Sequence, residues 1–223
     1  MKVAVLFSGG KDSTFAAYIA MQHGWEVSHF VSVFSESDSS YMFHVPNVHV
    51  APLLAEAAGS TFVGVRTNGE KEKELEDLKK ALAKLDIDGV VSGAVASEYQ
   101  RTRIERICEE IGIKSFAPLW HKDPKLLVRD MIEARFDMRI VGVFAEGFGP
   151  LWLGRKIDES ALADLCKLNE KYGVSVSGEG GEYESLVLDC PMFKKWLEIL
   201  ESSPEWRGSN GIFRVTKARL VNK

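Results

Sequence analysis

Two adjacent glycines followed by a lysine and an aspartate stand close to the start of the chain. Residues 8–13 read Ser-Gly-Gly-Lys-Asp-Ser and follow a run of apolar residues. Glycines let a backbone approach a ligand closely, while hydroxyl groups and a lysine ammonium attract an anion. Where such a loop joins a buried strand to a helix, the free N–H groups of the first helical turn add to that attraction. The segment therefore predicts a phosphate-binding loop.

The spacing within this loop excludes two common nucleotide-binding patterns. A Walker loop has four residues between its first glycine and its Gly-Lys pair, and the dinucleotide pattern reads Gly-x-Gly-x-x-Gly. Residues 8–13 match neither. The alternative interpretation is a tight turn in which Asp12 and Ser13 cap the following helix.

Asp12 is also a candidate ligand for Mg²⁺. A carboxylate beside a triphosphate is repelled unless a cation lies between the two groups, and carboxylate oxygens are ligands that Mg²⁺ prefers. Helix capping alone is the competing role for this side chain.

A second cluster of small and polar residues begins directly after the short apolar run at residues 89–92. Gly93 and Ala94 are small enough for a nucleotide to approach the backbone. On the helix expected next, the apolar stripe leads back to Ser97, Gln100 and Arg101. A core-facing stripe that turns polar over one turn usually faces a polar group. A solvated first turn is the alternative.

A third cluster, at residues 178–185, reads Gly-Glu-Gly-Gly-Glu-Tyr-Glu-Ser. Its glycines favour irregular backbone, so that two or more of the carboxylates of Glu179, Glu182 and Glu184 could converge. Converging carboxylates can bind a cation, orient ammonia or accept a proton during attack by an amine. A solvated acidic turn is the alternative.

The elements that must position these clusters alternate regularly through the first half of the chain. The pattern predicts strands at residues 3–7, 26–34, 61–65 and 89–92, and helices at residues 13–23, 50–58, 70–85 and 97–111. Repeated strand–helix units form a parallel sheet with helices on both faces, and its ligands bind beyond the carboxyl ends of the strands. We therefore expect an α/β fold with a doubly wound, Rossmann-like parallel sheet.

The alternation breaks at residues 118–124, where two prolines flank Leu-Trp-His-Lys-Asp. Beyond this point we expect helices at residues 125–134 and 158–172, and strands at residues 138–145, 185–188 and 211–220. The sequence therefore predicts a nucleotide-binding domain over residues 1–120 and a smaller α+β substrate-binding domain over residues 121–223.

Composition and charge restrict the class of protein. The 223 residues include 28 Lys and Arg against 32 Asp and Glu, a formal net charge of −4, so direct binding of nucleic acid is not expected. No apolar run is long enough for a membrane span or a signal peptide. Three widely spaced cysteines without a C-x-x-C pair argue against a disulfide framework or a structural zinc site. We expect a cytoplasmic protein with no membrane partner, in which a homo-oligomer is compatible with the composition.

Together, the three clusters resemble the diphthine–ammonia ligase family. Residues 8–13 are similar to the phosphate loop of the N-type ATP pyrophosphatases, which belong to the adenine nucleotide alpha-hydrolase superfamily and include asparagine and GMP synthetases. The block at residues 178–185 is more specific to diphthine–ammonia ligases. The resemblance extends from Val3 to about Pro191, and the compact length resembles archaeal members.

This resemblance implies an ATP-dependent amidation. Members of the family convert the carboxylate of diphthine, a trimethylated modified histidine on translation elongation factor 2, into the amide of diphthamide. The carboxylate would be adenylated with release of pyrophosphate, and ammonium would supply the nitrogen as AMP leaves. The implied ligands are ATP and Mg²⁺, and the implied partner is the elongation factor bearing diphthine.

The resemblance also implies roles for individual residues. Residues 8–13 would hold the β- and γ-phosphates, the ends of the first two strands would contact adenosine, and the two later clusters would surround the acyl group and the incoming ammonia. The implied nucleotide-binding residues are Leu6, Phe7, Ser8, Gly9, Gly10, Lys11, Asp12, Ser13, Val33, Phe34, Gly93, Ala94, Ser97 and Gln100. The implied catalytic residues are Lys11, Asp12, Arg101, Glu179 and Glu182, with Asp12 as the metal ligand.

Two other functions stay open at this point. The same chemistry could activate a small carboxylic acid, or the chain could be a sensor that binds an adenine nucleotide without turnover. If diphthine is the acceptor, its trimethylammonium group would suit an aromatic face, for which Tyr183, Trp120 and Trp152 are the candidates.

Overall fold

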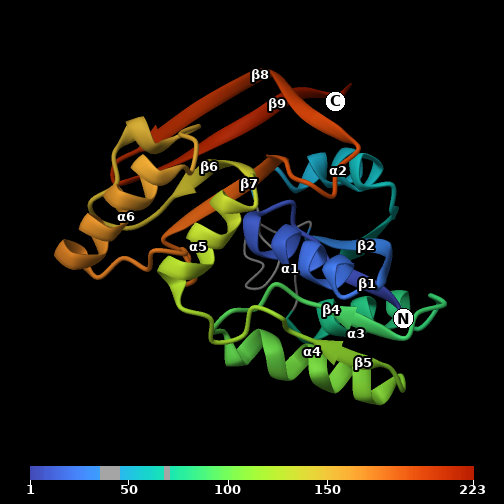
Figure 1. Cartoon of the computed structure of the whole chain (residues 1–223). Coiled ribbons are helices and arrows are strands. Elements are labelled where there is room, and N and C mark those ends of the chain that lie inside the picture. The colour runs from blue at the N-terminus through green and yellow to red at the C-terminus, as the bar shows by residue number, and fades with distance from the viewer. Residues whose placement is uncertain (36–45, 68–70) are drawn as a thin grey trace.

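Two β-sheets and the helices that cover them make up the computed structural model, which describes residues 1–35, 46–67 and 71–223 (Figure 1). The first sheet contains β1 (Lys2–Leu6), β2 (Glu26–Ser35), β3 (Thr61–Thr67), β4 (Gly89–Val91) and β5 (Lys114–Phe116). The second contains β6 (Asp137–Val143), β7 (Tyr183–Asp189), β8 (Lys195–Arg207) and β9 (Asn210–Asn222). The helices are α1 (Lys11–Gln22), α2 (Ala51–Ala58), α3 (Lys71–Leu82), α4 (Glu98–Glu110), α5 (Pro124–Glu133) and α6 (Glu159–Tyr172), with short 3-10 turns η1 (Val48–Val50) and η2 (Pro150–Trp152).

The first sheet is parallel throughout and has the strand order β3-β2-β1-β4-β5. The chain builds outward from β1 through β2 to β3, and then crosses to the other side of β1 to add β4 and β5. Ligands bind where this direction reverses, beyond the carboxyl ends of the strands. That position is the gap between the ends of β1 and β4. The predicted doubly wound α/β fold is confirmed.

Burial of β1 on both faces explains why it is apolar without alternation. Val3 and Val5 pack with α1 and α2 in one core cluster, whereas Ala4, between them, packs with α3 and α4 in a second cluster. All three residues are fully buried. Successive side chains of a strand point to opposite faces, so helices must cover both sides of this sheet.

The leucine-rich helix predicted at residues 70–85 is α3, which ends at Leu82. Leu75, Leu78 and Leu82 are buried against the sheet, as their helical spacing predicts. Glu70, the first residue of the prediction, lies outside the described residues.

The second sheet is antiparallel and has the order β7-β6-β9-β8. The strand predicted at residues 211–220 is β9, but β8 was not predicted. Much of β8 is exposed and polar, so it lacks the alternation that marks a half-buried strand. β5 was also missed, because its three residues are too few to form a pattern.

The two parts of the chain share one hydrophobic core. The Phe15 ring of α1 packs edge-to-face on Phe136, which directly precedes β6, with ring centroids 5.4 Å apart. The division predicted near residue 120 falls in the connection between β5 and α5; as a domain boundary it stays a prediction. Among the helices in the described ranges, none combines the length and apolar character needed to cross a bilayer.

Candidate functional site

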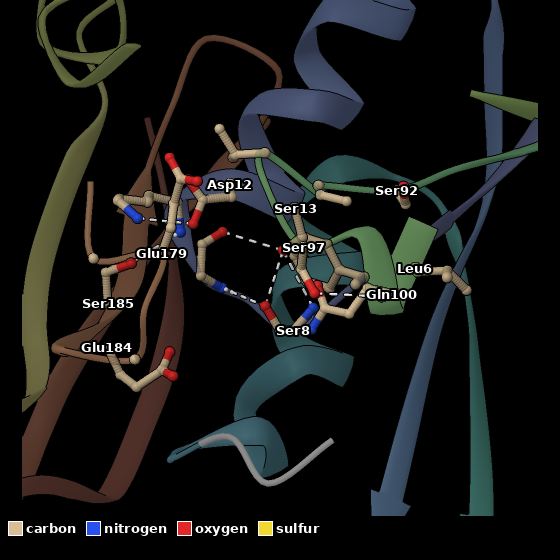
Figure 2. A pocket seen from close by; sticks show the side chains of 18 of the residues that line it. Leu6, Ser8, Asp12, Ser13, Ser92, Ser97, Gln100, Glu179, Glu184 and Ser185 are labelled. Carbon is tan, nitrogen blue, oxygen red and sulfur yellow. Dashed lines mark hydrogen bonds and ion pairs between the residues drawn. The ribbon is translucent and has the colours of Figure 1, made fainter. Parts of the chain in front are cut away.

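A cavity of about 600 Å³ opens at the carboxyl ends of β1 and β4, and β7 of the second sheet closes one of its sides (Figure 2). It brings together residues from all three clusters singled out in the sequence. The predicted residues that line it are Leu6, Phe7, Ser8, Gly10, Lys11, Asp12, Ser13, Val33, Gly93, Ala94, Ser97, Gln100 and Glu179. The third cluster, residues 178–185 (the acidic segment), therefore reaches residues 8–13 (the glycine loop), although more than 160 positions separate the two segments in the sequence.

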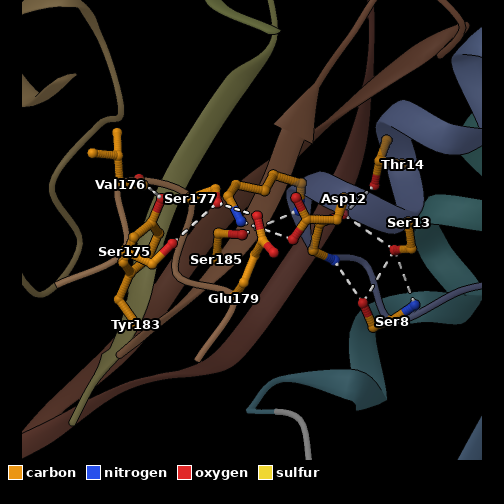
Figure 3. A network of polar contacts seen from close by, with 12 residues as sticks. Ser8, Asp12, Ser13, Thr14, Ser175, Val176, Ser177, Glu179, Tyr183 and Ser185 are labelled. Atoms are coloured by element: carbon orange, nitrogen blue, oxygen red, sulfur yellow. Dashed lines mark hydrogen bonds and ion pairs between the residues drawn. The ribbon is translucent and has the colours of Figure 1, made fainter. Parts of the chain in front are cut away.

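The glycine loop is held in shape by its own hydroxyl groups. Ser8 Oγ accepts a hydrogen bond from the backbone N–H of Gly10 at 3.2 Å and lies 3.1 Å from Ser13 Oγ (Figure 3). Ser13 Oγ also accepts from the Ser8 N–H at 3.2 Å. Gly9 has a φ of +81°, a left-handed conformation that glycine adopts without strain. The loop is therefore organised before any ligand binds.

β7 anchors this loop by hydrogen bonds to two of the loop's own backbone groups, the Gly9 carbonyl and the Lys11 N–H. The Val187 N–H donates to the Gly9 carbonyl at 2.9 Å, and the Lys11 N–H donates to Ser185 Oγ at 3.1 Å in a buried contact. The N–H of Lys11 belongs to the first turn of α1, where no intrahelical acceptor is available. β7 thus fixes the position of the loop directly.

The Lys11 ammonium is buried at the contact between α1 and β7. Its side chain is 3% exposed, and Nζ pairs with Asp12 Oδ2 at 2.7 Å and lies 5.2 Å from the centre of the Tyr183 ring. Burial is the largest effect on Lys11 and lowers its pKa, but the charge and hydrogen bond of Asp12, together with the charges of Tyr183 and Glu184, outweigh burial and raise the pKa above the ordinary lysine value. The sequence predicts that Lys11 adds a full positive charge to the loop, whereas in the structure Asp12 neutralises this charge.

Asp12 does not cap α1, because no backbone N–H of the described residues donates to it. Its Oδ2 is paired with Lys11, and its Oδ1 is buried with no hydrogen-bond partner in the part of the chain that the structure describes. The position before the helix is Gly10, which has no side chain to cap with. The capping interpretation of Asp12 is therefore wrong, and one carboxylate oxygen is left without a partner at the cavity.

Position 93 requires a glycine for a reason other than the predicted approach of a nucleotide to the backbone. A Cβ at this position would lie 2.7 Å from the backbone nitrogen of Ser13 and 2.8 Å from the carbonyl carbon of Asp12. The absence of a side chain thus lets the end of β4 pack directly on the first turn of α1. Ser97, four residues later, caps α4 by accepting from the Gln100 N–H at 3.3 Å.

Four predicted site residues lie outside the lining of the cavity. Gly9 faces Leu54 and β7, and Phe34 packs edge-to-face on Phe62. Arg101 pairs with two glutamates of its own helix, Glu105 at 2.9 Å and Glu98 at 3.1 Å. Their expected contacts with the nucleotide or acyl group have no support in this geometry.

Glu182 is the fourth, and the structure gives its carboxylate a structural task. Oε1 accepts from the Ser175 N–H at 2.9 Å, and Oε2 accepts from the Gly180 N–H at 2.8 Å. Both oxygens are thus used to shape the turn that carries Glu179. The expected catalytic role of Glu182 is not supported by its position.

The three aromatic candidates for a trimethylammonium contact each have a cation of this chain over one ring face. Lys11 lies over Tyr183, Arg101 over Trp120 at 4.6 Å, and Arg155 over Trp152 at 4.3 Å. Tyr183 is in addition only 2% exposed, and its hydroxyl donates to the Val176 carbonyl at 2.9 Å. A substrate cation on these faces would have to displace the resident one.

Glu184 was predicted only as one of three carboxylates that could converge, and not as an individual catalytic residue; the structure places it in the lining of the cavity. Burial raises the pKa of its carboxyl to about 7, while Lys11 opposes this effect and Asp12 adds to it. The segment was expected to be an irregular turn up to residue 184, but β7 already begins at Tyr183. The strand carries Glu184 and Ser185 into the site.

Comparison with known proteins identifies the family. A model of the diphthamide synthase N-terminal domain matches residues 1–115, and a model of the corresponding C-terminal domain matches residues 123–221. The chain belongs to the diphthamide synthase family. The acidic segment and the strand β7, which begins within it, therefore come from the C-terminal domain of this family, whereas the glycine loop comes from the N-terminal domain.

Individual diphthamide synthase relatives cover nearly all of the chain. A protein of Rattus norvegicus named diphthine–ammonia ligase is 33% identical over 99% of this chain and 91% of its own length. Proteins with the same name from Homo sapiens and Danio rerio are 34% and 33% identical, over 91% and 100% of this chain and 84% and 98% of their own lengths.

Proposed function

We propose that this chain is an ATP-dependent ligase that converts the carboxylate of diphthine, on translation elongation factor 2, into the amide of diphthamide. The observation that carries the proposal is the shared cavity, in which the organised glycine loop and the carboxylates of Glu179 and Glu184 line the same space. The name of the relatives agrees with the chemistry that this arrangement allows.

The first half-reaction activates an otherwise unreactive acid. A carboxylate oxygen of the substrate attacks the α-phosphorus of ATP, the bond to the β-phosphate breaks, and pyrophosphate leaves. Residues 8–13 support this step as an anion site, because α1 directs its N-terminus at the cavity and the two serine hydroxyls line it. The product is an acyl-adenylate, from which AMP is a good leaving group.

The second half-reaction forms the amide. Ammonia attacks the acyl carbon, the bond from carbon to the AMP oxygen breaks, and AMP leaves with the electron pair. Glu179 and Glu184 line the cavity beside the loop, so this nitrogen would arrive on the side closed by the second sheet. A cavity that holds both partners lowers the entropic cost of the attack.

Mg²⁺ is a further part of the proposal. No group of three His, Cys, Asp or Glu side chains suited to a metal occurs in residues 1–35, 46–67 and 71–223. The buried, unpartnered Oδ1 of Asp12 nevertheless fits an ion whose other ligands are phosphate oxygens and water. Such an ion would neutralise charge on the departing pyrophosphate.

The proposal is tested with elongation factor 2 that bears diphthine, incubated with this protein, ATP and ammonium. Mass spectrometry of the modified peptide should show an acid becoming an amide, with AMP and pyrophosphate formed in equal amounts. AMP formation with a small carboxylic acid, but not with the elongation factor, would favour the small-acid alternative. Tight nucleotide binding with no product under any condition would instead indicate a sensor.

A further inference from the structure

Four carboxylates lie in or beside the cavity, and three of them already have donors. Asp12 is paired with Lys11 at 2.7 Å, Glu179 accepts from Ser177 Oγ at 2.7 Å, and Glu182 accepts two backbone N–H groups. In the described part of the chain, neither a hydrogen bond nor an ion pair reaches the carboxylate of Glu184. It projects from β7 into the same hollow as Ser8 (Figure 2).

Glu184 is half-buried, which makes this isolation unusual. A carboxylate partly removed from water normally finds a charged or hydrogen-bonding partner, because losing hydration without a partner is costly. Its register partner in β6 is Gly142, which offers no side chain. The carboxylate of Glu184 therefore lines a ligand cavity and can accept a hydrogen bond or a proton from a molecule bound there.

We propose that Glu184 is the general base that takes the proton lost by ammonia as the amide forms. This inference rests on the proposed function and adds a residue to it. When ammonia attacks the acyl carbon, the C–N bond forms and the adduct carries a positively charged nitrogen. One proton passes from that nitrogen to Glu184, and the C–O bond to AMP then breaks, so that atoms and charges balance.

The electrostatic surroundings suit this role. Lys11 and Asp12 of α1 are the charged groups that act on Glu184, and with burial they place its pKa at about 7. A base is most effective when its pKa is close to the working pH, because it is then partly ionised and still able to hold a proton. Ordinary glutamates are weaker bases at neutral pH.

The test compares the wild-type protein with Glu184→Gln and with Glu179→Gln, which removes a carboxylate from the same cavity. Three rates are measured with diphthine-bearing elongation factor: exchange between ATP and pyrophosphate without ammonium, amide formation with ammonium, and hydroxamate formation with hydroxylamine. Exchange reports activation of the acid alone. Hydroxylamine is uncharged at neutral pH and strongly nucleophilic, so it depends less on a base than ammonia does.

For Glu184→Gln we expect exchange close to the wild-type rate, amide formation reduced about 100-fold, and a much smaller loss with hydroxylamine. For Glu179→Gln we expect equal losses with the two nucleophiles. The wild-type rate of amide formation per free ammonia should also rise through about pH 7, and this rise should be absent in Glu184→Gln.

Three results would overturn the inference. Glu184→Gln could lose exchange as strongly as amide formation, which would place Glu184 in binding or activation of the acid. It could lose activity equally with ammonia and hydroxylamine, or keep the full rate of amide formation. A wild-type protein without acceptor-dependent exchange would instead contradict the proposed function, and the inference with it.

Discussion

The hydroxyl of Ser185 accepts a hydrogen bond from the backbone N–H of Lys11 at 3.1 Å, across 174 positions of sequence. One residue belongs to the acidic segment and the other begins the helix behind the glycine loop. The backbones of Gly10 and Ser185 also approach each other closely here. A Cβ added to Gly10 would lie only 3.2 Å from the Ser185 carbonyl oxygen. This contact sets the distance between the phosphate site and the carboxylates that face it.

Ser185→Ala should weaken ATP binding as well as folding. The buried Lys11 N–H would lose its acceptor, which costs about 1–3 kcal/mol of the free energy of unfolding. The first turn of α1 would also lose an anchor at the ligand. The matched control is Ser60→Ala, which removes a hydrogen bond to the Val27 carbonyl at the opposite end of the sheet. Chemical unfolding and calorimetric ATP titration should show lower stability for both variants, but weaker ATP binding for Ser185→Ala alone.

Gly93→Ala should separate the end of β4 from α1. The new methyl group would lie under 3 Å from backbone atoms of Asp12 and Ser13, which cannot move aside as a flexible side chain could. Overpacking of this kind costs about 1–3 kcal/mol, and here it also displaces the phosphate loop. Gly149→Ala is the control, because a Cβ there meets nothing within 4 Å. Equal ATP affinity and stability in the two variants would contradict this account of Gly93.

Glu184→Gln should make the protein more stable above neutral pH. The pKa of Glu184 is about 7 in the folded protein against an ordinary value of 4.5, so between these values the folded state binds more protons than the unfolded state. Wild-type stability therefore falls as pH rises through this window, by about 3 kcal/mol in total, and glutamine removes this loss. Unfolding curves from pH 4 to pH 8 without ATP check the effect. A stability difference that stays constant with pH would argue against a raised pKa of Glu184 in the folded protein.

Asp12→Asn should remove the effect of Mg²⁺ on ATP binding. The unpartnered Oδ1 of Asp12 is the oxygen proposed to face the ion, and an amide is a much weaker ligand than a carboxylate. ATP titrations with and without Mg²⁺ should differ for the wild-type protein and coincide for the variant. Asp123→Asn, at the start of α5 and outside the cavity, should keep the wild-type response. A full Mg²⁺ response in Asp12→Asn would place the ion elsewhere.

The sequence predicted the fold and the edge of the sheet that carries the site, because both depend on the local pattern of apolar residues and on parallel topology. The run around Val5 predicted a strand buried on both faces, and parallel topology then placed residues 8–13 and 93–97 at one edge of the sheet. The leucine spacing of α3 predicted its buried face. These inferences succeeded because helical and strand periods are properties of the chain itself.

The sequence did not predict the roles of side chains that bond to other groups of the protein instead of facing the ligand. Glu182 and Glu184 are both glutamates of one short segment, yet Glu182 accepts from two turn N–H groups whereas Glu184 lines the cavity with no partner among the described residues. Which carboxylate is free depends on where β7 begins and on its alignment with α1. Arg101 was expected to face the ligand, but neighbouring glutamates on α4 hold it along the helix surface.

The most direct test of the proposed chemistry follows the oxygen atoms of the substrate. Diphthine labelled with oxygen-18 in its carboxylate is incubated with the protein, ATP and ammonium, and the nucleotide product is analysed by mass spectrometry. If the carboxylate attacks the α-phosphorus, one labelled oxygen appears in the phosphate of AMP and none in pyrophosphate. Labelled inorganic phosphate together with ADP, or unlabelled AMP beside a completed amide, would contradict the adenylation mechanism.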